Sequence, residues 1–135
     1  FDESGRANRI DEYFLGTSLM AGLKEVEKTV HDLGGLFIPS HINRPHNSLL
    51  SEIKNLPRKL NVDALEIDCK YLDSSPLDDH PELNLFTLIR NSDAHHIEGI
   101  GAFPTVYYLQ SPTFDEIRMA LSQADGRRIE IDFCK

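Results

Sequence analysis

Residues 34–41, with the sequence GGLFIPSH, join a predicted helix to a predicted strand and so indicate the fold. Upstream, apolar residues recur at alternating steps of four and three over residues 19–33, which is the pattern of one helix face. Gly34 can end this helix in a left-handed conformation, and Gly35 allows an immediate turn. The apolar run that follows and ends in His41 is typical of a buried strand. Helix, glycine turn and buried strand together make one unit of a parallel α/β array.

The same alternation continues along the chain. Further strands are predicted near residues 62–67, 83–89, 105–109 and 128–133, with helices near 47–56 and 113–125. Thr113 followed three residues later by Glu116 is a capping box, which predicts a helix start at that point. A loop is predicted at 73–81, and a loop or hairpin entering a short strand at 1–16. The predicted fold class is therefore α/β, with a mostly parallel sheet and flanking helices, or a segment of a barrel.

Length and charge limit the classes of function. With 135 residues, the chain is long enough for one domain with a core. Its formal net charge of -8 argues against a surface for duplex nucleic acid or an anionic membrane, because both require concentrated Lys and Arg. The charge does not exclude binding of a small nucleotide, or of a short single strand that is held through metal ions. No signal peptide or membrane-spanning run is recognisable, which favours the cytoplasm.

The two cysteines are too few and too far apart to indicate a disulfide framework. We therefore expect Cys69 and Cys134 to be reduced thiols.

Polar side chains follow three consecutive predicted strands. They are His41 with Arg44, then Glu66 or Asp68 with Cys69, then Asp93 with His95. Because parallel strands end at the same edge of a sheet, these side chains are expected to converge there. Nitrogen and carboxylate donors in this mixture suit zinc, manganese or iron, and such ions activate water and polarise phosphoryl oxygens.

Each of these residues also has an ordinary structural interpretation. A histidine at a strand end is more often hydrogen-bonded than metal-bound, and Asp93 can cap a turn. Arg44 can bind phosphate in a bidentate manner, or it can simply brace a carboxylate. Cys69 can be a small buried side chain.

Several separated motifs resemble the later motifs of the PHP family, the polymerase and histidinol phosphatase domain. They are residues 34–45, 63–67, 92–95 and 112–117, in the same order and with matching spacing. The resemblance implies a distorted barrel of the (β/α)7 type, built of parallel strands and helices. It also implies up to three divalent metal ions at the C-terminal edge and hydrolysis of phosphate esters by metal-activated hydroxide.

The resemblance also implies roles for individual residues. By motif position, His41 corresponds to the ligand of the third motif, and Asp93 and His95 to the paired ligands of the fourth, on different metal ions. Arg44 is the candidate catalytic residue, as a phosphate contact. Glu66 matches a recurrent acidic position without a ligand role. The resemblance leaves open whether five neighbouring residues join the metal site: Glu66, Asp68, Cys69, His46 and His96.

The chain departs from the family in lacking its first motif, a His-x-His strand, and its second. We therefore expect residues 1–135 to be a single domain that is the C-terminal half of a PHP domain, consistent with a start at Phe1. The expected function is that of a metal-dependent phosphoesterase in a full-length parent, acting on a small phosphorylated substrate, a nucleotide or a short oligonucleotide. The isolated fragment, with an incomplete metal site, is expected to be weak or inactive.

Two alternatives remain at this point. The sequence does not distinguish a nuclease of the same family from a small-molecule phosphatase, although the acidic charge favours the smaller substrate. The second alternative is a non-catalytic α/β module with a vestigial metal site, whose exposed sheet edge binds a partner or a second copy.

Overall fold

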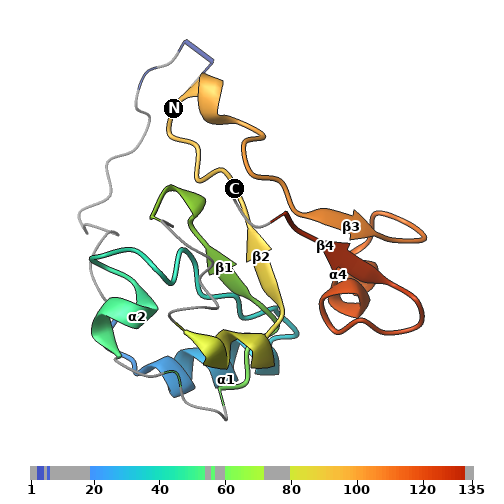
Figure 1. Ribbon diagram of the computed structural model, residues 1–135, viewed down its shortest axis with the longest axis horizontal. Coiled ribbons are helices and arrows are strands. Elements are labelled where there is room, and N and C mark those ends of the chain that lie inside the picture. The colour runs from blue at the N-terminus through green and yellow to red at the C-terminus, as the bar shows by residue number, and fades with distance from the viewer. Residues whose placement is uncertain are drawn as a thin grey trace.

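The computed structural model describes residues 3, 4, 6, 19–53, 56, 60–71 and 80–132. The predictions for residues 7–16 and 73–79, and those for Phe133 and Cys134, lie outside the described residues. The elements are α1 (Leu23–Asp32), α2 (Leu49–Glu52), β1 (Leu65–Ile67), β2 (Leu88–Arg90), β3 (Val106–Tyr108), α4 (Phe114–Leu121) and β4 (Arg128–Glu130). The fold is thus mixed α/β, with a parallel strand pair at its centre (Figure 1). Within the described residues, every helix is too short or too polar to span a membrane.

The parallel part of the fold contains three neighbouring segments. β1 and β2 pair in parallel, with Leu65 opposite Leu88. Residues 37–42 run along the other side of β1 in the same direction. Three backbone hydrogen bonds join them, from Asp63 N to Phe37 O (3.0 Å), from Glu66 N to Pro39 O (3.0 Å) and from Ile42 N to Glu66 O (2.9 Å). The strand predicted at 36–41 is therefore extended backbone beside β1 rather than a regular strand, as expected for a segment whose proline has no N–H.

The last strand pair corrects the prediction of a mostly parallel sheet. β3 and β4 are antiparallel, with Tyr107 opposite Ile129, and they form a separate two-stranded sheet against which α4 packs. Directly after α4 the chain reverses through Gln123, Asp125 and Gly126, whose φ angles of 55°, 49° and 77° are left-handed. This reversal sends β4 back along β3. That the chain forms part of a distorted (β/α)7-type barrel stays a prediction.

Side chains alternate between the two faces of the parallel pair, as strand geometry requires. On one face the buried cluster consists of Ile42, Leu56, Leu60, Leu65, Ile67, Leu83 and Leu88. On the other face Ala64 and Ile89 pack with Leu121 of α4 and with partly buried side chains that include Tyr107 and Ile129. The parallel pair is thus covered on both faces, in agreement with the apolar residues at all positions of its strands except Glu66 and Arg90.

The apolar run at 83–89 contains two kinds of structure. The strand that the sequence predicts there begins only at Leu88, and Pro81–Leu85 form a 3-10 helix instead. Proline is favoured in the first turn of a helix, which accounts for the helical start. Leu83 is still fully buried, whereas Leu85 is 64% exposed. Within this run only Leu83, Leu88 and Ile89 are buried, and only Leu88 and Ile89 lie in a strand.

The helix boundaries follow local signals. α1 ends as predicted, since Gly34 has a φ of 76° and the amide of Gly35 donates to the carbonyl of Val30 at 2.8 Å. α4 also begins as predicted, because the Thr113 hydroxyl accepts a hydrogen bond from the amide of Glu116. The Glu116 carboxylate does not complete the capping box. It accepts hydrogen bonds from Arg127 Nε (3.0 Å) and Nη2 (2.8 Å) and from the Gln110 amide (2.8 Å).

Glu116 gives a prediction about acid sensitivity. Its hydrogen bond with Arg127 is the main reason that the pKa of Glu116 lies below its usual value, and the Gln110 amide lowers it further. A lowered carboxyl pKa contributes stability that is present above the unfolded-state pKa of about 4.3 and is lost as the pH falls through the folded-state value. We expect Glu116→Gln to lower the thermal unfolding midpoint at pH 7, with a loss that shrinks below about pH 4. The exposed Glu98→Gln is the control, and a deficit that is equal at all pH values would contradict this assignment.

Candidate metal centre

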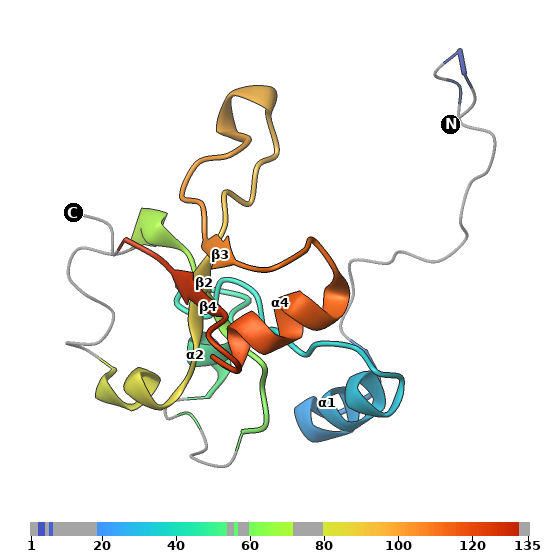
Figure 2. The same ribbon diagram turned by 90° about the vertical axis from the view of Figure 1, so that its right-hand side faces the viewer.

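The candidate residues lie at the C-terminal ends of the three parallel segments. His41 ends the extended segment beside β1, Asp68 follows β1, and Asp93 follows β2. His95 lies two residues beyond Asp93, in a loop over residues 91–104 that extends away from both sheets (Figures 1 and 2). Parallel strand direction therefore brings residues that are up to 54 positions apart in sequence (41 to 95) to one edge.

Arg44 bridges two carboxylates at this edge. Its Nε and Nη2 donate to Asp68 Oδ2 at 2.7 Å and 2.6 Å, and Nη2 also binds Asp93 Oδ2. Asp68 is only 6% exposed, so this ion pair is largely shielded from solvent. The guanidinium carbon also lies 5.9 Å from the ring centroid of Tyr71. Of the two interpretations of Arg44, the structure shows the one in which it braces carboxylates.

The charges around Asp93 show which side chains are its neighbours. The hydrogen bond from Arg44 is the main reason that the pKa of Asp93 lies below its usual value, while burial opposes this shift. The Coulomb interaction with Arg44 lowers the pKa of Asp93 further, and His95 and His41 make smaller contributions in the same direction. The Asp68 and Asp93 carboxylates in turn raise the pKa of Arg44. Both imidazoles that the sequence singled out therefore lie near the Asp93 carboxylate.

The two histidines each leave one ring nitrogen for a ligand. His41 Nδ1 is buried and has no hydrogen-bond partner among the described residues, and its Nε2 lies 3.4 Å from Ser40 Oγ. His95 Nδ1 lies 2.9 Å from the carbonyl oxygen of Asp93. A ring N–H that donates to a carbonyl fixes the tautomer and leaves the other nitrogen as an electron-pair donor. His95 Nε2 is then the nitrogen available to a cation.

Glu66 connects two of the segments. Its Oε1 accepts a hydrogen bond from the backbone amide of His41 (3.3 Å), and its Oε2 accepts one from the side chain of Asn91 (2.7 Å). Asn43, which the sequence did not single out, binds the backbone of Asp68 on both sides, with Nδ2 to the carbonyl at 2.9 Å and Oδ1 to the amide at 2.8 Å. In the sequence, only its position next to Arg44 indicated that Asn43 belongs to the site.

The remaining candidates are less suitable as ligands. His46 is exposed. Cys69 is disulfide-bonded, which corrects the expectation of a reduced thiol and removes it as a thiolate ligand; Cys134 lies outside the described residues. A disulfide sulfur carries no thiolate charge for a metal ion.

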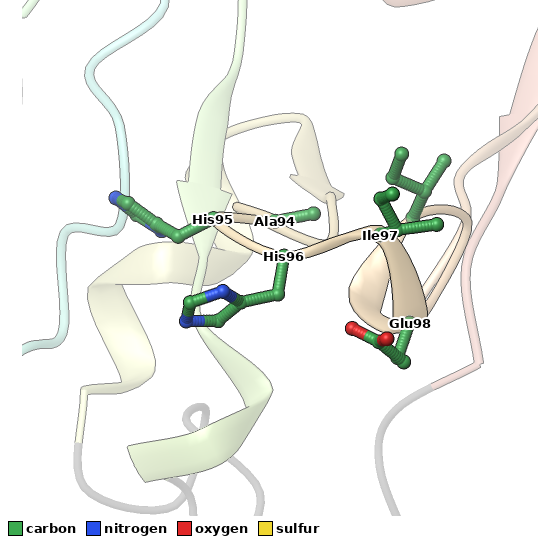
Figure 3. A pocket seen from close by; sticks show the side chains of 6 residues that line it. Ala94, His95, His96, Ile97 and Glu98 are labelled. Carbon is green, nitrogen blue, oxygen red and sulfur yellow. The ribbon is translucent and has the colours of Figure 1, made fainter.

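The 91–104 loop carries an open pocket of about 510 Å³ next to His95. Figure 3 shows that the rings of His95 and His96 project to different sides, with His96 on the side of Glu98. Thr105 holds the loop at its base, because its hydroxyl accepts from the Arg90 amide (2.9 Å) and donates to the Arg90 carbonyl (2.7 Å). His95 and His96 are thus adjacent in sequence but have different surroundings.

The donor set fits part of a metal site. A buried imidazole nitrogen without a partner, a carboxylate and an oriented second imidazole are donors that zinc, manganese and iron accept. Within the described part of the chain, however, no group of three or more His, Cys, Asp or Glu side chains is arranged to hold an ion. These residues are suitable donors in kind but do not form a complete coordination shell within the described part of the chain.

No protein-family model matches the chain. In structure, the chain is similar to a lesion-specific endonuclease. The endonuclease is PfuEndoQ from Pyrococcus furiosus, and the comparison gives a TM-score of 0.69 and 28% sequence identity over 79% of this chain and 28% of that chain. In sequence, the chain is 36% identical over 109 residues to the uncharacterized protein YqxK of Bacillus subtilis (strain 168), which covers 77% of this chain and 28% of that protein. The chain thus spans about a quarter of the length of both proteins.

Proposed function

We propose that this chain forms part of a metal-dependent phosphoesterase of the PHP type. The observation that carries the proposal is geometric: His41, whose buried Nδ1 has no hydrogen-bond partner among the described residues, and Asp93 follow parallel segments that end at one edge, and His95 Nδ1 contacts the Asp93 carbonyl. In this assignment His41 Nδ1, the Asp93 carboxylate and His95 Nε2 would each contribute one ligand to a multinuclear site, with Asp93 and His95 on different ions. A bound divalent cation would supply Lewis acidity and lower the pKa of a bound water.

Arg44 is the proposed contact for the substrate phosphate. Two of its nitrogens, Nε and Nη2, already bind carboxylates, and Nη1 has no hydrogen-bond partner among the described residues. A guanidinium that is fixed on Asp68 loses little further freedom when it binds a phosphate oxygen.

The proposed substrate is a phosphate ester of a nucleotide or a short single strand. Similarity to an endonuclease supports a phosphodiester, and the net charge of -8 disfavours tight contact with duplex phosphates. We further propose that residues 1–135 are the C-terminal part of a PHP domain, and that the remaining ligands belong to other parts of a longer protein. The small share of each relative that the chain covers supports this arrangement.

An assay of phosphate-ester hydrolysis tests this function. The chain is incubated with bis(p-nitrophenyl) phosphate, with and without added Mn²⁺ or Zn²⁺. We expect weak release of p-nitrophenol that requires the metal, stops on addition of a chelator and falls at least about 100-fold in Asp93→Asn. Release that is independent of the metal and of Asp93 would contradict the proposal.

A further inference from the structure

We propose that the free edge of the extended segment at residues 36–40 is a dimerisation site. A second copy of the chain adds its own residues 36–40 there as an antiparallel strand, so that one continuous sheet runs through both copies. This dimer is independent of the proposed function, because it uses the backbone of residues 36–40 and no metal ligand.

Only one side of residues 36–40 is paired, the side that faces β1 and the residues before it. The carbonyls of Phe37 and Pro39 accept hydrogen bonds from the amides of Asp63 and Glu66, and the Phe37 amide donates to Asp63 Oδ2 at 2.7 Å. Backbone groups alternate in direction along an extended chain. The groups that face away from β1 are therefore those of Leu36, Ile38 and Ser40. Within the described residues, none of these N–H and C=O groups has a hydrogen-bond partner.

This edge lacks the usual protection against pairing. Natural sheets protect a free edge with a charged side chain, a proline or a covering element. Residues 36–40 contain no charged side chain. Their proline, Pro39, faces β1 through its carbonyl, so its missing N–H lies on the paired side and not on the free edge. Ser40 is exposed, and Leu36 and Ile38 are only partly buried. The free edge thus keeps all of its backbone donors and acceptors.

The edge is complementary to itself. In an antiparallel pair centred on Ile38, this residue faces its own equivalent, and Leu36 faces the equivalent of Ser40 in the second copy. Each facing pair can then exchange both of its N–H···O bonds. The side chains of Leu36 and Ile38 already pack on the smaller apolar cluster, which contains Leu121. Pairing of the edges would place these side chains of the two copies on the same face, where cross-strand apolar contacts add to the backbone bonds.

Charge gives the dimer a characteristic dependence on salt. With a net charge of -8, two copies of the chain repel each other. Residues 34–40 carry no charge, so pairing along this edge sets no like charges opposite each other. Added salt screens the remaining repulsion, and the dimer should therefore tighten as salt increases. Association through ion pairs would show the opposite trend.

Analytical ultracentrifugation over a concentration series tests the dimer. We expect dimerisation of the unmodified chain that tightens between about 50 and 500 mM NaCl. Ile38→Pro removes an N–H that no described group accepts, and it should weaken the dimer about 10-fold or more, because each copy loses one hydrogen bond. Ile38→Ala is the matched control, since it also shortens the side chain but keeps the N–H, and it should dimerise more tightly than Ile38→Pro.

Four results would overturn the proposal. They are an unmodified chain that stays monomeric up to about 1 mM, a dimer that weakens with salt, a dimer that is unchanged in Ile38→Pro, and equal losses in Ile38→Pro and Ile38→Ala.

Amide hydrogen exchange gives a second readout, which holds even if Ile38→Pro does not fold. In the unmodified chain, the amides of Ile38 and Ser40 should exchange more slowly as the protein concentration rises, because pairing protects them. The Phe37 amide is the internal control, because it is already bonded to Asp63, and its exchange should change less with concentration. Exchange at Ile38 and Ser40 that does not depend on concentration would exclude this edge as the contact.

Discussion

Replacing Leu65 with alanine is expected to lower the free energy of unfolding by about 2–5 kcal/mol, the usual cost of a Leu to Ala change in a core. Leu65 is fully buried at the start of β1, opposite Leu88, and packs in the larger apolar cluster with Ile42 and Leu83. These neighbours belong to three separate segments, so they cannot all move inward to fill the space. Urea unfolding followed by circular dichroism measures the loss.

Leu33→Ala is the matched control, because Leu33 is 83% exposed at the end of α1. Its cost should stay within about 0.5 kcal/mol. Similar costs for the two variants would show that the parallel pair is not the centre of the core.

His95→Ala should have the largest effect on metal binding. If His95 Nε2 is a direct ligand, its loss removes one of the three proposed donors, and the dissociation constant for Mn²⁺ should rise by about 100-fold or more, beyond the 10–100-fold typical of an outer-shell partner. Metal-dependent hydrolysis should fall with it. Calorimetry at fixed pH gives the affinity, and the p-nitrophenyl assay gives the rate.

His96→Ala is an unusually close control for this variant. His96 is the next residue, is also exposed, and its ring points to a different side from that of His95 (Figure 3). It should bind Mn²⁺ as the unmodified chain does. Equal losses in the two variants would show that the loop attracts cations in a general way and that His95 is not a specific ligand.

Local signals in the sequence predicted the parts of the fold that depend on neighbouring residues. The glycine pair after α1 and the Thr113 cap of α4 are confirmed, because each acts within a few residues of itself. The antiparallel pairing of β3 and β4 depends on contacts between distant segments, which strand propensity does not encode. The same limit explains the late start of β2, since an apolar run fits a buried helical turn as well as a strand.

Part of the site was also predictable. Strand order alone placed His41 and Asp93 at one edge, because parallel segments end together. The partners of Arg44 could not be predicted, because Asp68 and Asp93 lie 24 and 49 residues away along the chain and no motif links them. The structure shows the carboxylate contacts that the sequence allowed for Arg44, and phosphate binding by Arg44 stays a prediction. The metal roles of His41, Asp93 and His95 stay predictions.

The left-handed backbone of His41 and Asp93, with φ angles of 34° and 44°, also bears on how this chain tolerates mutation. Glycine enters this region of backbone space without steric cost, whereas residues with a Cβ enter it at a penalty. Selection for thermal stability alone would therefore tend to replace both residues with glycine and erase the candidate site. In a homologue, retention of the imidazole and the carboxylate at these two positions would mark selection for chemistry over stability.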